Sequence, residues 1–135
     1  MFGAITSAHS GMTVYRTWLD STSDNIANAN TIRSTDQPAY QARYVRAQAV
    51  EGGGPYGVGG GARVAGVEFG DPEGRLAYQP DHPLADENGM VRTPDIDMGV
   101  EMSSLMMAQR GYQANLAVVE RARDAYRAAL QLGRQ

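Results

Sequence analysis

The sequence contains no cysteine, and because all 12 of its Lys and Arg positions are arginine, it contains no lysine either. Without cysteine there is no thiol nucleophile, zinc–thiolate site, iron–sulfur cluster or disulfide. Without lysine there is neither a Walker-type phosphate loop nor an enzyme that forms a Schiff base through a lysine amine. The two absences exclude several large classes of enzyme, and they leave the redox compartment undetermined.

Long hydrophobic runs are also missing. The longest, residues 105–108 and 116–119, are far shorter than the roughly 20 residues that cross a bilayer. The first basic residue is Arg16, so the N-terminus lacks the cationic and apolar regions of a secretory signal peptide. We therefore expect no direct membrane insertion, and export, where it occurs, without a cleaved signal peptide.

An excess of positive charge is missing too, since 15 acidic residues outnumber the basic ones and the net charge is −3. Nucleic-acid-binding domains normally carry a basic face, whereas these arginines are scattered between acidic residues. We therefore expect no nucleic-acid partner. A chain of 135 residues that is 42% hydrophobic fits one domain with a modest core.

Two segments near the ends of the chain have helical hydrophobic spacing, with apolar residues three and four positions apart. The N-terminal stripe is weak because several members are small: Ile5, Ala8, Met12, Tyr15, Leu19, Thr22, Ile26 and Ala29. The C-terminal stripe is longer and stronger: Met98, Met102, Leu105, Tyr112, Leu116, Val119, Tyr126 and Leu130. Ala108 and Ala122 are placed to take the contact where Gln109 and Arg123 interrupt the second stripe. Asp97 is its expected N-cap and Gly133 its expected C′ residue.

The middle of the chain has the composition of short strands and turns. Tyr40–Val50 alternates loosely, and two sets of residues are predicted to share a strand face: Ala65, Val67 and Phe69 in one strand, Leu76 and Tyr78 in another. Residues 52–61 form a glycine-rich loop. The prediction is an α+β fold in which an N-terminal helix (1–33) and a C-terminal helix (95–135) pack as an antiparallel coiled-coil-like pair. A small β-rich insert (34–94) lies between them.

Two polar motifs have a ligand-binding and a structural interpretation. Residues 57–62 match GxGxxA, but a dinucleotide site needs a strand before it and a helix after it, so a flexible loop is favoured. Residues 81–89 loosely resemble a calcium loop or a metal site on His82, but Leu84 interrupts the oxygen ligands. A turn in which Gly89 supplies a positive φ is favoured there. We expect neither a cofactor nor a metal.

A hydrolase constellation is the third alternative, built from Ser7, His9 and Ser10. No GxSxG elbow accompanies these residues, and a solvated helix face is the favoured interpretation. We expect no catalytic residue. The methionine-rich patch of Met98, Met102, Met106 and Met107 indicates adaptable apolar packing. The functional interpretation of the same property is that the patch binds a partner.

Four motifs resemble those of bacterial flagellar rod and hook proteins. SDNIANANT at 23–31 resembles their N-terminal S-x-N-I-A-N-x-x-T signature, and RGYQAN at 110–115 resembles their C-terminal R-x-Y-x-A-N element. Residues 94–97 with Glu101 and Met102 resemble the segment that opens the C-terminal helix. HPLADENGMV at 82–91 is similar to the H-P-x-A-D-x-x-G-x-V motif of the proximal rod member. Gly111 departs from the family, which has serine there.

The resemblance implies a self-assembling structural subunit of the flagellar basal-body rod, in its proximal part, that transmits torque through the periplasm. It implies no enzyme. Another rod subunit, or a junction or adaptor subunit of the same axial assembly, is the alternative. The implied partners are copies of the chain itself, other flagellar rod proteins, components of the junction between the rod and the MS ring, and the flagellar type III export apparatus.

In this family the two terminal helices pair and then pack among neighbouring subunits, so the resemblance places the subunit interface on their apolar and amide side chains. The expected interface residues are Ile5, Met12, Tyr15, Leu19, Asn25, Ile26, Asn28, Met102, Leu105, Tyr112, Asn115, Leu116, Val119, Tyr126 and Leu130. Three amides among them, Asn25, Asn28 and Asn115, are expected to form hydrogen bonds at helix–helix contacts. Arginines of the C-terminal helix are expected to pair with carboxylates across subunit contacts.

Overall fold

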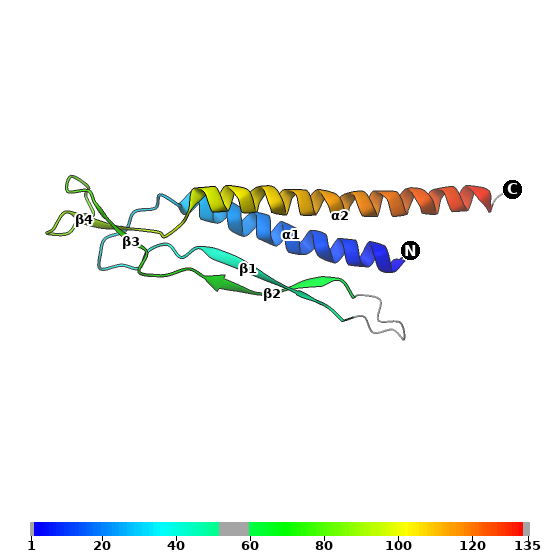
Figure 1. Cartoon of the computed structure of the whole chain (residues 1–135), viewed down its shortest axis with the longest axis horizontal. Coiled ribbons are helices and arrows are strands. Elements are labelled where there is room, and N and C mark those ends of the chain that lie inside the picture. Colours follow the sequence, from blue (N-terminus) through cyan, green and yellow to red (C-terminus); the bar gives the residue numbers. More distant parts are fainter. Residues whose placement is uncertain (1, 52–59, 134–135) are drawn as a thin grey trace.

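The structure is a computed structural model that describes residues 2–51 and 60–133. Its elements are α1 (Phe2–Asn28), β1 (Arg43–Ala49), β2 (Ala62–Phe69), β3 (Arg75–Tyr78), β4 (Met90–Thr93) and α2 (Met98–Leu132). The helices lie side by side and antiparallel, β1 and β2 form a hairpin along α1, and the β3–β4 sheet lies beyond one end of the helices (Figure 1). The predicted α+β fold is confirmed. Residues 52–59 of the predicted glycine-rich loop lie outside the described residues.

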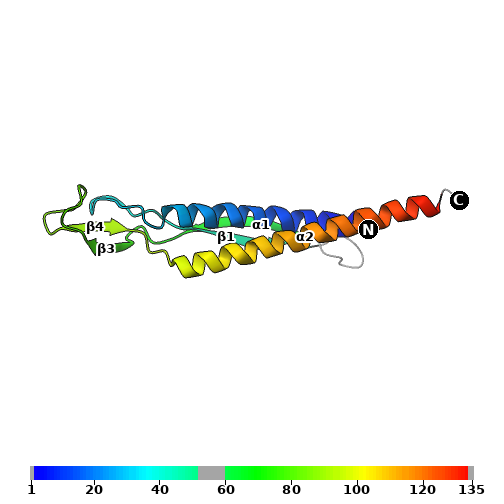
Figure 2. The same cartoon turned by 90° about the horizontal axis from the view of Figure 1, so that it is seen from above.

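Three close approaches define the register of the two helices. Asn25 lies against Glu101, Tyr15 against Gly111, and Gly11 against Asn115. These pairs are separated by equal numbers of residues on both helices, so the antiparallel register is continuous. It places Ala4 opposite Ala122, and α2 continues past the beginning of α1, as Figure 2 shows.

Small residues form the side of α2 that faces α1. Ala108 is fully buried, Gly111 packs beneath the ring of Tyr15, and a Cβ on Gly11 would lie 2.8 Å from Oδ1 of Asn115. Each glycine therefore makes room for a side chain of the opposite helix, Gly111 for the ring of Tyr15 and Gly11 for the amide of Asn115. The position foreseen for Ala108 is confirmed, and it is the small residues that set the distance between the helices.

Several large members of the predicted stripe of α2 do not face α1 and are exposed in the single chain. Met98, Met102, Leu116, Tyr126 and Leu130 are between 37% and 53% exposed. Leu105, Tyr112 and Val119 are half-buried at the edge of the contact. Because close approach selects small residues, the large apolar side chains are rotated onto the flanks of the helix.

The ends of α2 are largely as predicted. The carboxylate of Asp97 accepts hydrogen bonds from the backbone N–H groups of Gly99 (2.8 Å) and Val100 (3.1 Å), which confirms the N-cap. The helix ends at Leu132, immediately before Gly133. Gly133 has a φ of −75°, however, so it does not adopt the left-handed conformation of a C′ glycine.

The hairpin corrects two sequence predictions. Arg46 pairs with Gly66 and Ala47 pairs with Val64, so Ala65 is bulged out and does not share a face with Val67. The hydroxyl of Ser10 accepts a hydrogen bond from the backbone N–H of Ala62 (3.0 Å). The prediction that this helix face is solvated is wrong at Ser10, because the Ser10 hydroxyl attaches β2 to α1.

Substitution of Gly111 tests the close helix contact. In Gly111→Ala the new Cβ overlaps the ring of Tyr15, which is itself stacked on Trp18 and has little freedom to move. We expect a loss of about 1–2 kcal/mol in the free energy of unfolding, after the gain of about 1 kcal/mol in helix propensity. The measurement is urea unfolding followed by circular dichroism.

Gly3→Ala is the matched control, because a Cβ on Gly3 meets nothing within 4 Å. It gains helix propensity without a clash, so we expect equal or higher stability. Equal stabilisation by both substitutions would show that the helices are not in close contact at Gly111.

Candidate assembly interface

A buried amide joins α1, β1 and α2. The side chain of Asn25 is 1% exposed, and its Nδ2 donates to Oε2 of Glu101 (3.3 Å) and to the backbone carbonyl of Arg43 (3.0 Å). Its Oδ1 accepts from the backbone N–H of Arg43 (2.8 Å) and from the hydroxyl of Tyr40 (3.4 Å). Both N–H groups and both lone pairs are used. The predicted hydrogen bond at a helix–helix contact is confirmed for Asn25.

Two tyrosines beside this amide are held in the protonated form. Burial raises the pKa of Tyr40, and it also raises the pKa of Tyr44, with the negative charge of Glu101 adding to the effect at both. Since an unperturbed phenol already titrates well above neutral pH, both hydroxyls are neutral there. The Tyr40 hydroxyl is therefore a donor toward Asn25 at neutral pH.

The other two predicted amides form local hydrogen bonds, within their own helices or just beyond the helix end. Nδ2 of Asn28 donates to the carbonyl of Asp24 (2.9 Å), and its Oδ1 accepts from Oγ1 of Thr31 (3.1 Å). Nδ2 of Asn115 donates to the carbonyl of Gly111 (2.8 Å). A role of Asn28 and Asn115 in contacts between subunits stays a prediction.

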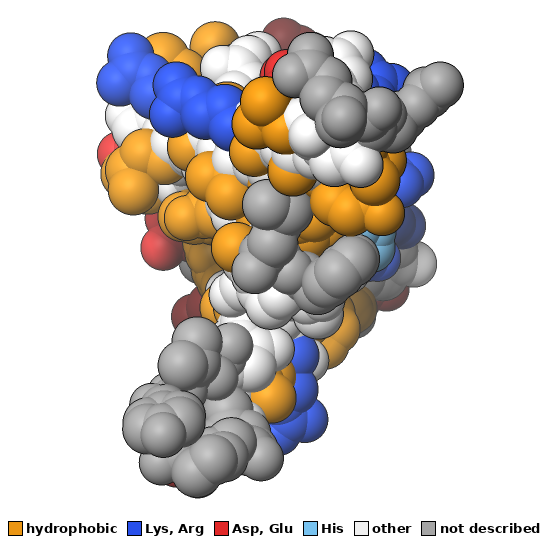
Figure 3. Space-filling view, turned by 90° about the vertical axis from the view of Figure 1, so that its right-hand side faces the viewer, with side chains coloured by type: hydrophobic (Ala, Val, Ile, Leu, Met, Phe, Trp, Pro, Cys, Tyr) orange, Lys and Arg blue, Asp and Glu red, His pale blue; other side chains and the backbone are white. Residues whose placement is uncertain are grey.

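The remaining predicted interface residues divide between the helices. Those of α1 are half-buried: Ile5, Met12, Tyr15, Leu19 and Ile26. On α2, Met102, Leu116, Tyr126 and Leu130 are exposed, while Leu105, Tyr112 and Val119 are half-buried. Seen from the end of the molecule where both termini lie, hydrophobic side chains gather on the surface with arginines beside them (Figure 3).

Among the exposed apolar residues of α2, sequence reasoning missed Val100 and Val118. Val100 is 59% exposed and Val118 is 42% exposed. Neither residue falls on the heptad-like stripe. A helical projection identifies them as exposed only once Glu101 and Ala108 are known to face α1. The accessible apolar surface of α2 is therefore wider than the predicted stripe.

The polar cluster at 81–89 is a turn. The carboxylate of Asp86 accepts hydrogen bonds from the backbone N–H groups of Met90 and Asn88, both 2.9 Å long, and from Oγ1 of Thr35 (3.1 Å). These hydrogen bonds lower the pKa of Asp86, and the bond from the backbone N–H of Met90 has the largest effect. Gly89 has a φ of +75°, so the predicted turn is confirmed.

Neither a metal-binding cluster nor a membrane span is found in the described parts of the chain. Among residues 2–51 and 60–133, no three His, Cys, Asp or Glu side chains are grouped as metal ligands would be. No helix within those residues is both long and apolar enough to cross a membrane.

Asn25→Ala tests the buried amide. It removes the donor to a carboxylate that is itself 4% exposed, and the acceptor of the Arg43 N–H. We expect a loss of about 2–4 kcal/mol in the free energy of unfolding. Asn28→Ala is the control on the same helix and is expected to cost about 1 kcal/mol or less, because it breaks bonds within one helix end. Equal losses in the two variants would contradict a special role for Asn25.

Asn25→Asp keeps the volume and places a second carboxylate beside Glu101. Two carboxylates at one buried site raise each other's pKa in the folded state above the unfolded value. Stability is then retained below the unfolded pKa and lost as the pH rises through the folded one. We expect the free energy of unfolding of the variant to be closest to that of the unsubstituted chain near pH 4 and furthest from it near pH 7. Urea unfolding at the two pH values measures this difference. A deficit that does not change with pH would contradict this geometry.

Comparison with known proteins identifies the family. Residues 87–132 match the family described as flagellar basal body rod FlgEFG protein C-terminal. The flagellar basal-body rod protein FlgC of Borreliella burgdorferi is 33% identical over 98% of this chain and 97% of its own length. FlgC of Salmonella typhimurium is 36% identical over 85% of this chain and 84% of its own length, and FlgC of Bacillus subtilis is 26% identical over 98% of both. The chain therefore belongs to the FlgC family of flagellar basal-body rod proteins.

Proposed function

We propose that this chain is a structural, self-assembling subunit of the flagellar basal-body rod. The observation that carries the proposal is the similarity to FlgC over 98% of the chain, which includes both helices and the insert. The proposed activity is assembly, without catalysis. As part of the rod, the subunit transmits torque mechanically through its contacts.

The two helices differ in how much apolar surface they expose, and this difference supports assembly. The apolar stripe of α1 is half-buried within the chain, whereas α2 exposes large apolar residues along its length. Soluble monomers rarely expose such a series of apolar residues, and apolar surface of this kind marks interaction sites. We assign the exposed residues Met102, Leu116, Tyr126 and Leu130 to subunit contacts, together with the half-buried Leu105, Tyr112 and Val119.

Arginines near the end of α2 are available for polar contacts at the same surface. Arg123 and Arg127 lie 4.0 and 3.9 Å from Asp124, at the limit of an ion pair, and their side chains are 60% and 63% exposed. Ion pairs this long and exposed contribute little within the chain. The planar guanidinium groups can therefore pair with carboxylates of a neighbouring subunit.

The proposed partners are copies of the chain, other rod proteins, components of the junction between the rod and the MS ring, and the flagellar type III export apparatus. The proposed location is the proximal rod in the periplasm, reached without a cleaved signal peptide. Residues 87–132 match the family described as flagellar basal body rod FlgEFG protein C-terminal, which supports a second candidate, another rod or junction subunit of the same axial assembly. The similarity to FlgC over most of the chain favours the first candidate.

Leu130→Ser tests assembly through the exposed surface of α2. Leu130 is 53% exposed, so the folded chain is expected to tolerate the change within about 0.5 kcal/mol. Loss of a buried leucine contact costs about 1.5–3 kcal/mol, which corresponds to tenfold or more in affinity. We expect a reduction of about that size in the amount of chain recovered with purified basal bodies, and reduced swimming.

Leu76→Ser on β3 is the control, since Leu76 is 56% exposed and lies in the insert. Immunoblots of the exported fraction separate an assembly defect from an export defect. Normal incorporation and swimming of Leu130→Ser would contradict the assignment of this surface.

A further inference from the structure

An apolar trough lies between the β1–β2 hairpin and α2. It consists of two adjoining hollows of about 230 and 220 Å³ that share Trp18 and Val45. The first is lined by α1 and the hairpin, and the second reaches α2 at Val100 and Ser104. The stacked rings of Tyr15 and Trp18, with centroids 6.0 Å apart, lie along α1. Together the hollows form a concave surface, here called the trough, that borders four elements, α1, β1, β2 and α2.

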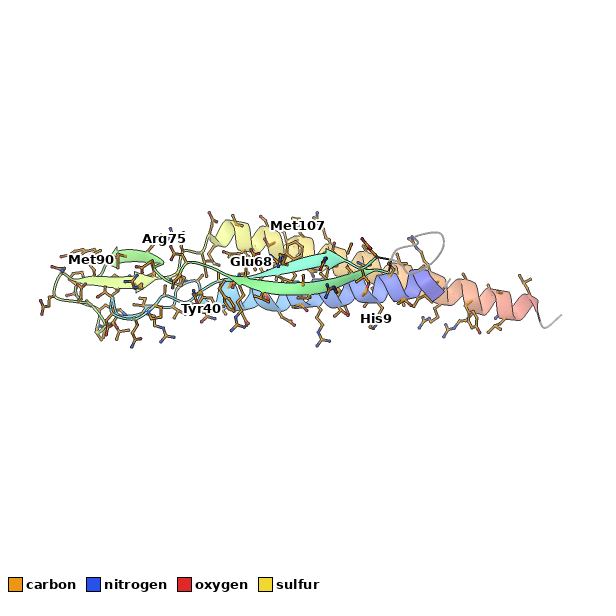
Figure 4. The ribbon with its side chains drawn as sticks, turned by 90° about the horizontal axis from the view of Figure 1, so that it is seen from below. His9, Tyr40, Glu68, Arg75, Met90 and Met107 are labelled. Atoms are coloured by element: carbon orange, nitrogen blue, oxygen red, sulfur yellow. The ribbon has the colours of Figure 1, made fainter. Side chains whose placement is uncertain are left out.

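Two exposed apolar groups lie on opposite flanks of α2. Met98, Met102 and Met106, here called the methionine row, are spaced four residues apart and therefore lie on one flank. Val100, which lines the trough, and Met107 lie on the other flank, and the line from Glu101 to Ala108 that faces α1 separates the two flanks. Figure 4 labels Met107 on α2.

We propose that the methionine row of one copy packs into the trough of a second copy. The row is convex, with its members 41%, 50% and 53% exposed, and the trough is concave, apolar in its first hollow and mixed in the hollow that reaches α2. Methionine side chains are unbranched and adapt to irregular hollows, and their sulfur atoms pack favourably against aromatic rings. The second copy is the occupant because the same chain carries both complementary surfaces.

The position of the two surfaces determines the kind of assembly. The row and the α2 wall of the trough come from the same turns of the helix, between Met98 and Met107, so the two copies lie side by side. Each copy uses a different surface toward each neighbour, which makes the contact heterologous. Such contacts repeat into a ring or a helical array, as a rod requires. The inference rests on the proposed function and adds the surfaces through which neighbouring copies meet.

The exposed charges near the two surfaces are opposite in sign. Arg43 lines the trough beside the buried Glu101, whereas Asp97, the N-cap of α2, immediately precedes the methionine row and Asp95 is paired with Arg75 at 2.9 Å. Within the chain Arg43 pairs with Asp24 at 3.3 Å, with the two side chains 50% and 56% exposed. An ion pair this exposed contributes little to stability, so Arg43 can exchange it for a carboxylate of the neighbouring copy.

Cysteine cross-linking tests the contact, because the sequence contains no cysteine of its own. The double variant Val100→Cys/Met102→Cys places one thiol on each flank of α2, too far around the helix to bridge within one chain. Cells that carry the variant as their sole copy are treated with copper–phenanthroline and analysed on non-reducing gels. We expect a ladder of dimers, trimers and higher multiples, with bands at least tenfold stronger than in either single variant.

Controls separate this contact from the others. Ser104→Cys/Met98→Cys is an independent pair across the same two surfaces, since Ser104 also lines the trough, and it is expected to give the same ladder. Val100→Cys/Leu76→Cys places the second thiol on an equally exposed residue of β3 and is expected to give none. Variants recovered from basal bodies in normal amount without a ladder from either test pair would overturn the proposal. Strong dimers from a single variant would overturn it too, since they would show identical surfaces in contact.

The outcome also distinguishes the inference from the proposed function. Failure of the unsubstituted chain to purify with basal bodies would reject the proposed function itself. A chain that purifies with basal bodies and fails to cross-link as a ladder rejects only the side-by-side contact.

Discussion

The close contact between α1 and α2 is the constraint on which the rest of the structure depends. Gly111 lies beneath the Tyr15 ring and Gly11 lies against Asn115, so the helices approach to a distance that a Cβ at either glycine would prevent. The large apolar residues of α2 are consequently displaced to its flanks. The surface offered for assembly is thus a direct result of how the two helices pack within one chain.

Polar contacts fix the two closely packed helices in a single register. Asn25 uses its full hydrogen-bonding capacity on Glu101, Tyr40 and the backbone of Arg43, so a shift of one helix along the other would leave buried polar groups without partners. The same amide holds the beginning of β1, and Ser10 holds the beginning of β2 at the other end of the hairpin. The width and position of the trough follow from these two attachments.

The β3–β4 sheet depends on polar interactions more than on a core. Two strands of four residues bury little apolar area, although Val91 is fully buried. Arg92 compensates by donating to the carbonyl of Thr35 (2.8 Å) and to Oε2 of Glu73 (3.1 Å), and its backbone pairs with Arg33. The turn at Asp86 closes the sheet. This end of the molecule is therefore held by arginine and aspartate side chains that connect three separate segments.

Local rules in the sequence determined the two long helices, the Asp97 cap, the turn at Gly89 and the α+β arrangement, because spacing, capping and positive φ act over a few residues. The flagellar motifs indicated the family in the same way. Three features were decided only by the tertiary structure: the side of α2 that faces α1, the bulge at Ala65 and the attachment made by Ser10. A heptad-like stripe marks large apolar residues, whereas close approach of two helices selects alanine and glycine. Which of these two faces is buried depends on the partner helix, and no single helical segment contains that information.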